Sequence, residues 1–429
     1  MSDPRNLSNW MRFLPDNWST TKFTFPGTHN SHATDANYDD TNFPGVKDWT
    51  ICQAMSIPEQ LHCGVRFIDL RVGNDTSYRM RHGKAQLKNT LKDVLAWIND
   101  FLKQEKTETV LVSVKWDHDG VGEPHSMDGE IYHLWDGYGW YRKNDWPALG
   151  EVRGKAILLR RFWDQGVAKA PLNGVDLYPI YGQSWKGSPG AWSQNGDGKA
   201  TDLKPSDVWD TVWKQINRAS ESNINDNWQH FTWLSHTGTI VGLSPATPWF
   251  YAQDLNSHLL EYLNDDGHHE DPANHRYGCI VTDFFHWAMG AEMVSRNWAS
   301  QVHNPNTWHV MAKNDPFLTM DSPRGDKVQF SLTKRAVLKV SVNGQEIWRS
   351  GYDWSEESDN HMLAFEADGN LCLWRNDPHG PADKGGRSLH WNTETRKGWD
   401  TRLRFLAGPP YILVDFTISH GDVLWWPNK

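Results

Sequence analysis

Ionisable side chains follow short apolar runs at several places in the first part of this 429-residue chain. His29 comes directly after the run FTFPGT, so it begins a loop at the end of a predicted strand. Asp69 and Arg71 are two residues apart in RFIDLRV and face the same side of a strand, and His82 follows shortly afterwards. Histidines and carboxylates transfer protons and arginine binds anions, so these four residues are candidates for one reactive site.

Three further strand-like runs also end on charged residues. VLVSVKWD contains Lys115, AILLRRFW contains Arg160 and Arg161, and CIVTDFF contains Asp283. Solvation alone does not explain this pattern, because the residues before each charge are apolar and should be buried. We therefore predict that these side chains gather at the carboxyl end of a parallel sheet, where the reactive groups of a barrel lie.

Strand-like and helix-like patterns alternate from residue 22 to about residue 287. Strands are predicted at 22–25, 65–72, 109–116, 155–162, 177–181, 231–235 and 279–284, and helices at 87–104, 205–221 and 254–263. This alternation predicts an α/β fold with a parallel sheet. A (β/α)8 TIM-type barrel over residues 1–303 fits the length. An open doubly wound sheet is the alternative, but no glycine-rich phosphate loop supports it.

Residues 304–429 carry many short strands and turn signals without a convincing helix, which predicts a separate all-β domain. A degenerate repeat runs through 330–342, 363–374 and 403–416, and each copy is followed by a short strand that carries a tryptophan. We predict a threefold β-prism whose core contains these three tryptophans: Trp348, Trp391 and Trp425.

The motifs PGTHNSH, IDLRV, RHG, VSVKWD, LLRRFW and VTDFF, in this order and spacing, resemble the catalytic barrel of the phosphatidylinositol-specific phospholipases C. The small bacterial, metal-independent enzymes are the most similar, and the resemblance covers residues 15–300. It implies an enzyme, a phosphoric diester lyase or hydrolase, that cleaves phosphatidylinositol or a glycosyl-phosphatidylinositol. The inositol 2-hydroxyl would attack phosphorus, giving cyclic inositol phosphate and diacylglycerol.

The same resemblance implies roles for individual residues. His29 would be the general base, with Asp283 holding its ring, and His82 would protonate the leaving oxygen with Asp69 as its orienting carboxylate. Arg71 would bind the phosphate as negative charge develops on it. The implied residues that bind the inositol ring or its phosphate are Lys115, Arg161, Gln183 and Trp185.

Asn30 departs from the bacterial pattern, which has Asp after the first histidine. Asn at this place resembles the calcium-dependent relatives, in which it is a metal ligand, yet Arg71 stands where those enzymes have a second acidic residue. Too few oxygen ligands for Ca²⁺ can be assembled from the sequence. We therefore expect no metal and no cofactor, with Ca²⁺ as the alternative, and we count Asn30 among the catalytic residues. An inactive barrel that serves as a binding scaffold is a further alternative.

Alternating residues of one predicted strand resemble the mannose-binding signature QxDxNxVxY of the bulb-type lectins: Glu366, Asp368, Asn370, Cys372 and Trp374. Side chains at alternate positions point the same way, so three polar groups could bind sugar hydroxyls. The other two repeats lack the signature, which leaves at most one sugar site or a purely structural prism. A carbohydrate-binding lectin with an inactive barrel is thus the alternative function. A third hypothesis joins both halves, because glycosyl-phosphatidylinositol anchors carry mannose beside inositol phosphate.

Charge and hydropathy limit the partners. The chain has 43 Lys+Arg against 53 Asp+Glu, a formal charge of −10, so no basic field exists to bind nucleic acid. No apolar run approaches the roughly 20 residues of a bilayer span, and no signal-peptide pattern is visible. We expect a protein that is cytoplasmic or exported without a signal peptide, with peripheral contact to a phosphoinositide-containing membrane. The four cysteines are expected to be reduced, mostly buried thiols.

The 26 tryptophans are unusually many. Tryptophan on loops at a barrel mouth suits a membrane interface or a sugar ring. The residues predicted on such loops are Trp49, Trp135, Trp140, Trp163, Trp185 and Trp192.

Overall fold

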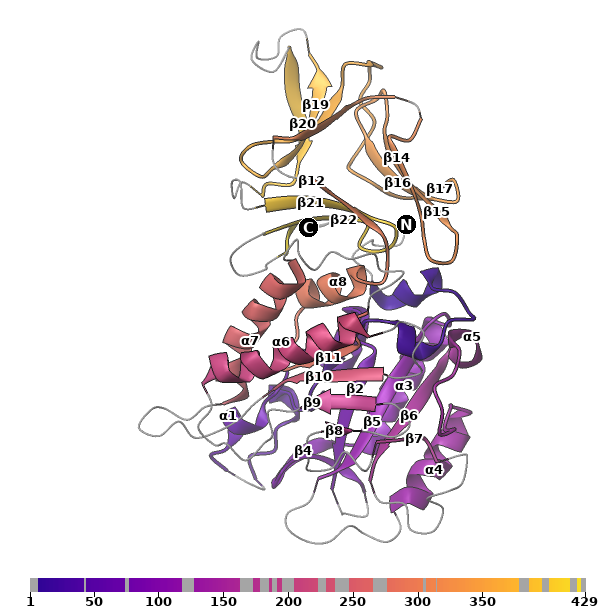
Figure 1. Cartoon of the computed structure of the whole chain (residues 1–429), viewed down its shortest axis with the longest axis vertical. Coiled ribbons are helices and arrows are strands. Elements are labelled where there is room, and N and C mark those ends of the chain that lie inside the picture. The colour runs from indigo at the N-terminus through magenta and orange to yellow at the C-terminus, as the bar shows by residue number, and fades with distance from the viewer. Residues whose placement is uncertain are drawn as a thin grey trace. The chain divides into compact units, whose positions relative to one another are not determined.

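The structure is a computed structural model, and it describes residues 7–41, 44–73, 77–117, 127–162, 173–177, 185–186, 191–194, 204–222, 229–235, 247–264, 276–303, 306–313, 315–377, 386–395, 401–416 and 423–425. The chain divides into two compact units. We call residues 15–259 and 274–294 the α/β unit, and residues 1–14, 260–273 and 295–429 the β unit. Figure 1 shows the helices and strands of both.

A largely parallel sheet forms the centre of the α/β unit (Figure 1). Its strands are β1 (Phe25–Thr28), β2 (Phe67–Val72), β3 (Arg79–His82), β4 (Ala85–Thr90), β5 (Thr109–Trp116), β6 (Lys155–Arg161), β7 (Val175–Asp176), β8 (Trp185–Lys186), β9 (Ala191–Gln194), β10 (Gln229–Leu234) and β11 (Cys279–Thr282). They pair in the order β7-β6-β5-β2-β1-β11-β10-β9-β8, with β3 and β4 attached beside β2. From β7 through β9 every pairing is parallel, so the carboxyl ends of these strands lie at one edge.

Helices connect these strands. They are α1 (Lys47–Thr50), α2 (Ile57–His62), α3 (Leu91–Gln104), α4 (Met127–Tyr138), α5 (Leu149–Val152), α6 (Pro205–Glu221), α7 (Pro248–Asn264) and α8 (Trp287–Ser295), with short 3-10 helices η1 (Leu7–Phe13), η2 (Thr20–Lys22) and η3 (Asp35–Asn37). Helix α3 begins at Thr90, whose hydroxyl accepts from the Asp93 N–H, while the Asp93 carboxylate accepts from the Thr90 N–H. Its buried residues recur at helical spacing: Leu91, Val94, Leu95, Ile98, Phe101 and Leu102.

The predicted α/β class and its parallel sheet are confirmed. Several predicted boundaries were wrong, among them the following two. The strand expected at 22–25 is β1 at Phe25–Thr28, because Thr20–Lys22 forms a 3-10 helix capped by Ser19; His29 therefore follows the strand directly. The first residues of the helix expected at 87–104 belong to β4. Closure of the sheet into a full barrel is not shown, since β7 and β8 do not pair with each other within the residues that the structure describes.

The β unit contains three four-stranded antiparallel sheets. The strands are β12 (Ser300–His303), β13 (Trp308–Met311), β14 (Leu318–Asp321), β15 (Lys327–Leu332), β16 (Leu338–Val342), β17 (Gln345–Arg349), β18 (Met362–Phe365), β19 (Leu371–Asn376), β20 (Arg387–Asn392), β21 (Thr401–Leu406), β22 (Ile412–Phe416) and β23 (Val423–Trp425). Each repeat supplies three consecutive strands, and the segment before the repeats supplies β12, β13 and β14, one to each sheet. The threefold repeat in the sequence thus corresponds to three equivalent sheets.

Two features of this unit bear on the sequence predictions. Because β12 pairs with β21, residues 300–303 lie with the C-terminal sheets, and the compact units divide the chain before the expected boundary at 303/304. The rings of Trp348 and Trp391 meet edge to face with centroids 6.2 Å apart. Trp348 is buried, as predicted for the core, whereas Trp391 is only half-buried. The Trp425 side chain lies outside the described residues.

The tryptophans expected at the barrel mouth fall into three groups. Trp49 is 38% exposed, as predicted, but it lies in α1 and not on a loop. Trp135 and Trp140 are buried, so their assignment to an exposed rim was wrong: Trp135 lies within α4, and its ring packs edge to face on that of Trp140. Trp163 lies outside the described residues, as do the side chains of Trp185 and Trp192. No helix in the described ranges has the length and apolar character needed to cross a bilayer.

Candidate active site

The position of His29 is fixed by its neighbours at the end of β1. Its N–H donates to the Thr282 carbonyl of β11, and its ring Nδ1 lies 2.8 Å from Asp283 Oδ1. Gln53 Nε2 donates both to the His29 carbonyl at 2.9 Å and to the Thr282 carbonyl at 2.8 Å. A buried glutamine thus ties the His29 loop to the end of the adjacent strand, and Asp283 orients the imidazole so that Nε2 faces the site.

Strand register explains why charges from three strands converge. Asp69 pairs with Ser113 of β5, and Arg71 pairs with Lys115. Lys115 in turn pairs with Arg161 of β6. Residues at such paired positions share a face of a parallel sheet, so one layer at the carboxyl edge contains Arg71, Lys115 and Arg161.

Asp69 is held by two guanidinium groups. Arg71 Nε lies 3.2 Å from Asp69 Oδ2, and Arg161 Nη1 lies 3.0 Å from Asp69 Oδ1. Although burial alone would raise it, Arg71 and Arg161 hold the pKa of Asp69 well below its ordinary value. The carboxylate is therefore ionised and serves as the anchor for both arginines. Its expected role as the carboxylate that orients His82 was wrong, because the Nδ1 of His82 bonds to the Thr50 carbonyl instead.

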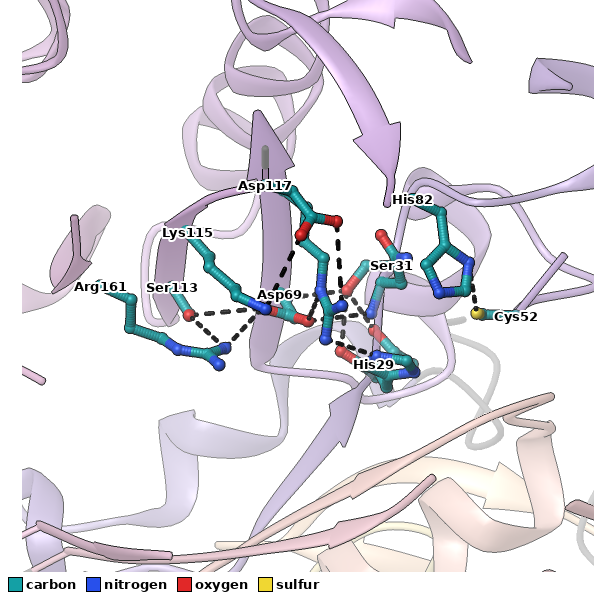
Figure 2. Close-up of polar contacts among 12 residues, drawn as sticks. His29, Ser31, Cys52, Asp69, His82, Ser113, Lys115, Asp117 and Arg161 are labelled. Carbon is teal, nitrogen blue, oxygen red and sulfur yellow. Dashed lines mark hydrogen bonds and ion pairs between the residues drawn. The ribbon is translucent and has the colours of Figure 1, made fainter. Parts of the chain in front are cut away.

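Arg71 also reaches the base. Its Nη2 lies 2.6 Å from His29 Nε2, and its Nη1 lies 4.0 Å from Asp117 Oδ2 (Figure 2). Lys115 Nζ lies 3.8 Å from the other oxygen of Asp117. Asp117 thus contacts both of these cations, Arg71 and Lys115.

His82 approaches from β3. Its Nδ1 donates to the Thr50 carbonyl at 2.9 Å, and the next residue, Gly83, donates its N–H to Asp117 Oδ2 at 2.7 Å. The His29 and His82 rings stand nearly perpendicular, with centroids 6.0 Å apart. Nδ1 of each ring is thus occupied, while Nε2 of His29 contacts Arg71 Nη2.

Burial keeps both imidazoles neutral in the free protein. Burial first, and then the charge of Arg71, hold the pKa of His29 well below its ordinary value of 6.5. The same two causes lower the pKa of His82. Against the effect of burial, Lys115 and Arg71 lower the pKa of Asp117. A neutral imidazole can accept a proton, and an additional negative charge nearby would favour the protonated form of His82.

Aromatic rings lie beneath these charges. Trp233 of β10 contacts the His29 ring edge to face at 5.9 Å, and Arg161 stacks over the Trp233 ring at 5.0 Å. Phe67 and Phe231 pack against each other at 5.5 Å, and Phe67 reaches Trp233 at 5.6 Å. These rings exclude water below the polar layer, which strengthens the electrostatic interactions above it.

Asn30 has an unusual environment. It adopts a positive φ of 45°, and its N–H donates to Asp69 Oδ2 at 3.1 Å. Its side chain is fully buried, and neither amide atom has a hydrogen-bond partner among the described residues. Unsatisfied buried amides are rare and costly, so this one calls for a functional explanation.

Most of the residues predicted from the sequence come together here. The residues that gather at the carboxyl edge of the sheet are His29, Asn30, Asp69, Arg71, His82, Asp283, Lys115 and Arg161. Gln183 lies outside the described residues, and so does the side chain of Trp185. The sequence reasoning missed Asp117, Gln53, Cys52 and Trp233. Asp117 had a visible signal, because it ends the run that contains Lys115; the others come close only through the tertiary fold.

The lectin-like signature is used for internal contacts. The Asn370 side chain is buried, accepting from Thr393 Oγ1 at 2.9 Å and donating to Asn392 Oδ1 at 3.3 Å. Trp374 Nε1 donates to Glu366 Oε1 at 2.8 Å. Asp368 is exposed, and Cys372 is buried. The polar groups aligned on this strand are thus largely engaged with one another and with β20.

Comparison with known proteins agrees with this geometry. Residues 24–162 match the family model of the phosphatidylinositol-specific phospholipase C X domain. The matched range contains His29, Asp69, Arg71 and His82, and it ends just after Arg161.

Among curated relatives, the 1-phosphatidylinositol phosphodiesterase of Listeria monocytogenes is 32% identical over 164 residues, covering 35% of this chain and 47% of the relative. The Staphylococcus aureus enzyme of the same name is 26% identical over 166 residues, covering 37% of this chain and 52% of the relative. The chain therefore spans about half the length of the curated relatives that it matches.

Solved structures extend the likeness beyond the matched segment. The phosphatidylinositol-specific phospholipase C from Listeria monocytogenes superposes with a TM-score of 0.53 at 23% identity, covering 68% of this chain and 99% of that chain. A mutant of the Staphylococcus aureus enzyme gives 0.56 at 20% identity, covering 69% and 100%. The α/β unit therefore has the TIM-like fold of these phospholipases.

Proposed function

We propose that the protein is an enzyme that cleaves phosphatidylinositol by the phospholipase C reaction, without a metal. The observation that carries the proposal is the pair of perpendicular imidazoles, His29 and His82, with the Arg71 guanidinium bonded to the first of them. When a hydroxyl of the substrate attacks its own phosphodiester, the reaction requires a base, an acid and a cation that stabilises the negative charge on the phosphate. The similarity to the 1-phosphatidylinositol phosphodiesterases of Listeria monocytogenes and Staphylococcus aureus supports the same reaction.

The first step follows from the contacts of His29. In the free protein its Nε2 accepts a hydrogen bond from Arg71 Nη2. The inositol 2-hydroxyl would take the place of this donor and lose its proton to Nε2, while Asp283 stabilises the resulting imidazolium through Nδ1. Arg71, released from the ring but still anchored on Asp69, would then bind the phosphate oxygens where charge increases in the transition state.

The second step belongs to His82. Its Nδ1 is held by the Thr50 carbonyl, so Nε2 would deliver a proton to the diacylglycerol oxygen as that oxygen leaves. The products are cyclic inositol phosphate and diacylglycerol. Lys115 and Arg161 would bind inositol hydroxyls or phosphate from the neighbouring strands.

A calcium ion does not fit this site. Ca²⁺ requires six to eight oxygen ligands, whereas Asp69 is already bonded by Arg71 and Arg161. Lys115 adds a third cation to the same layer. Asn30 offers one amide oxygen, and three positive groups around it oppose the approach of a divalent cation. We therefore propose that these cations supply the charge that calcium supplies in other enzymes.

Exposed aromatic residues of the α/β unit support contact with a lipid surface. Trp249 and Phe250 at the start of α7 are 52% and 40% exposed, and Trp49 in α1 is 38% exposed. The Trp249 ring contacts Phe284, the residue after Asp283, at 4.8 Å, so the Trp249 side chain lies near the active-site edge of the sheet. Because the net charge is −10, the attraction to a membrane would be hydrophobic rather than electrostatic.

We further propose that the β unit binds a glycan through three side chains of its lectin-like signature: Glu366, Asp368 and Trp374. These are the signature side chains that are not buried, and Asp368 is exposed. A glycosyl-phosphatidylinositol carrying mannose would then be a substrate recognised by both units. A glycan array tests this directly; absence of mannose binding would leave the unit with a structural role and the substrate as a plain phosphatidylinositol.

Incubation with phosphatidylinositol micelles in EDTA tests the proposed function. We expect a soluble cyclic inositol phosphate, identified by phosphorus NMR, to appear at the same rate with and without the chelator. No product under either condition, from protein that is folded by circular dichroism, would favour the alternative of a lectin with an inactive barrel. Product formed only with added Ca²⁺ would overturn the metal-free mechanism.

A further inference from the structure

A cysteine lies among the catalytic groups without a part in the mechanism above. Cys52 is fully buried, and its Sγ lies 3.7 Å from His82 Nδ1 and 3.6 Å from the Thr50 carbonyl (Figure 2). On its other side are His29 and Asp283. His29, Cys52 and Asp283 each offer one ligand atom, and these three atoms lie within 4.8 Å of one another. Among the residues that the structure describes, this is the group of His, Cys, Asp and Glu side chains that could hold a metal ion.

The donor set is that of a soft divalent cation. Zinc binds thiolate sulfur at about 2.3 Å and imidazole nitrogen or carboxylate oxygen at about 2.0–2.2 Å. Ligand atoms arranged in this way around one ion lie about 3–4 Å apart, so small side-chain rotations would close the present separations. Calcium and magnesium, which prefer oxygen, gain nothing from the sulfur or the nitrogen.

Charge balance also favours such an ion. With Cys52 as thiolate, Asp283 as carboxylate and His29 as neutral imidazole, a Zn²⁺ ion makes the buried cluster electrically neutral. Binding would release the thiol proton of Cys52 to solvent and place the metal where the proton shared by His29 Nδ1 and Asp283 now lies. A neutral cluster avoids the large cost of an uncompensated buried charge.

We propose that His29, Cys52 and Asp283 form an inhibitory binding site for Zn²⁺ or a similar soft divalent cation. Metal coordination at Nδ1 leaves the single proton of neutral His29 on Nε2, so the ring cannot accept the inositol proton. Because the Arg71 guanidinium can only donate, its Nη2 would lose its bond to the protonated Nε2 and would have to move away from the ring. A bound metal therefore stops the reaction by removing the base. This inhibitory effect rests on the proposed function, whereas the metal binding itself does not.

Cadmium titration tests the site without any need for activity, because a cadmium–thiolate bond gives an ultraviolet charge-transfer band. Cys63 is half-buried and lies 3.9 Å from the Met55 sulfur, so it is the competing thiol and supplies the matched control. We expect Cys63→Ser to keep a band that saturates at one Cd²⁺ per chain, and Cys52→Ser to lose it. Cys52→Ala, checked by circular dichroism, guards against a serine-specific folding defect.

Zinc inhibition provides the second readout. We expect Zn²⁺ to inhibit the wild type and Cys63→Ser alike, and the concentration for half inhibition to rise in Cys52→Ser by more than the roughly 10–100-fold typical of lost outer-shell contacts. A band or an inhibition that survives unchanged in both Cys52 variants overturns the proposal. A cadmium band that depends on Cys52 in a protein without phosphodiesterase activity would sustain the metal site and refute the proposed function.

Discussion

Two buried asparagines show how the units differ. Asn370 in the β unit has its amide oxygen bonded to Thr393 and its amide nitrogen bonded to Asn392. Asn30 in the α/β unit is equally buried, but neither of its amide atoms has a partner among the described residues. Both belong to motifs that resemble known binding signatures. A buried group whose hydrogen bonds are satisfied locally fits a structural role, whereas an unsatisfied buried group calls for a separate explanation.

The same contrast holds for histidine. His361 in the β unit is buried, and its Nδ1 accepts the Asn376 N–H at 2.7 Å, which completes the backbone of β19. His29 directs Nε2 to the Arg71 guanidinium, a donor that we propose a substrate hydroxyl replaces. Identical residue types are thus committed to structure in one unit and kept available for chemistry in the other.

The largest expected effect separates these two histidines. We expect His29→Ala to lower kcat on phosphatidylinositol by roughly 10²–10⁴, the contribution of a general base. His361→Gln should leave kcat per folded molecule unchanged and lower the melting temperature instead. A comparable loss of kcat in both variants would erase the distinction between the units.

Arg71 should come next in size. Arg71→Lys keeps the positive charge but cannot bind Asp69, His29 and a phosphate with one planar group, so we expect kcat/KM to fall by roughly 10²–10³. The matched control is Arg375→Lys in the β unit, where the guanidinium stacks on Trp354 at 3.8 Å. Steady-state kinetics should show no change in the control; an Arg71→Lys enzyme of normal kcat/KM would rule out that Arg71 stabilises the negative charge on the phosphate.

Buried histidines also predict how stability depends on pH. Burial, with Arg276 and Arg218 nearby, lowers the pKa of His230 to about 4 from 6.5. Between these values the unfolded chain binds a proton that the folded protein does not, so stability is highest above pH 6.5 and falls as the pH drops toward 4. His230 alone would account for up to about 3 kcal/mol of this loss. Urea unfolding of His230→Gln should show a flatter pH dependence than the wild type; an equally steep one would contradict the assignment.

The smallest effect concerns the two asparagines themselves. Asn370→Gly should cost about 1–3 kcal/mol, because the Thr393 hydroxyl and its neighbours lose a buried partner. Asn30→Gly should change stability by less than about 1 kcal/mol, since glycine tolerates the positive φ and removes an unsatisfied amide. Urea denaturation measures both, and equal losses would show that Asn30 is as well satisfied as Asn370.

The sequence alone predicts the sheet and much of the site, for a physical reason. In parallel strands the apolar run precedes the carboxyl end, so a charge after such a run marks the active edge, as with Lys115, Arg161 and Asp283. What the sequence cannot show is which strands are neighbours. Cys52 meets His82, and Trp233 meets His29, only through tertiary packing and the pairing of β10 with β11.

The tryptophans show where a prediction from the sequence was wrong. Trp135 and Trp140 stand beside glycines and tyrosines and look like loop residues, yet both are buried. The rings of Tyr138 and Trp140 stack with centroids 4.5 Å apart. The closely spaced aromatic residues that suggested an exposed rim therefore pack against one another at the end of α4. Trp249 and Phe250 are exposed and lie in the first turn of α7. The sequence predicted this helix only from residue 254 onward, so both residues were missed.

A change of leaving group tests most directly the central claim, that His29 is the base and His82 the acid of one reaction. A p-nitrophenyl ester of inositol phosphate expels a stable anion and needs no acid, whereas diacylglycerol needs a proton to leave. We expect His82→Ala to lose roughly 10² or more in kcat on phosphatidylinositol and to keep most of its activity on the activated ester, while His29→Ala fails on both. Equal loss on both substrates in His82→Ala, or retained activity in His29→Ala, would contradict the account.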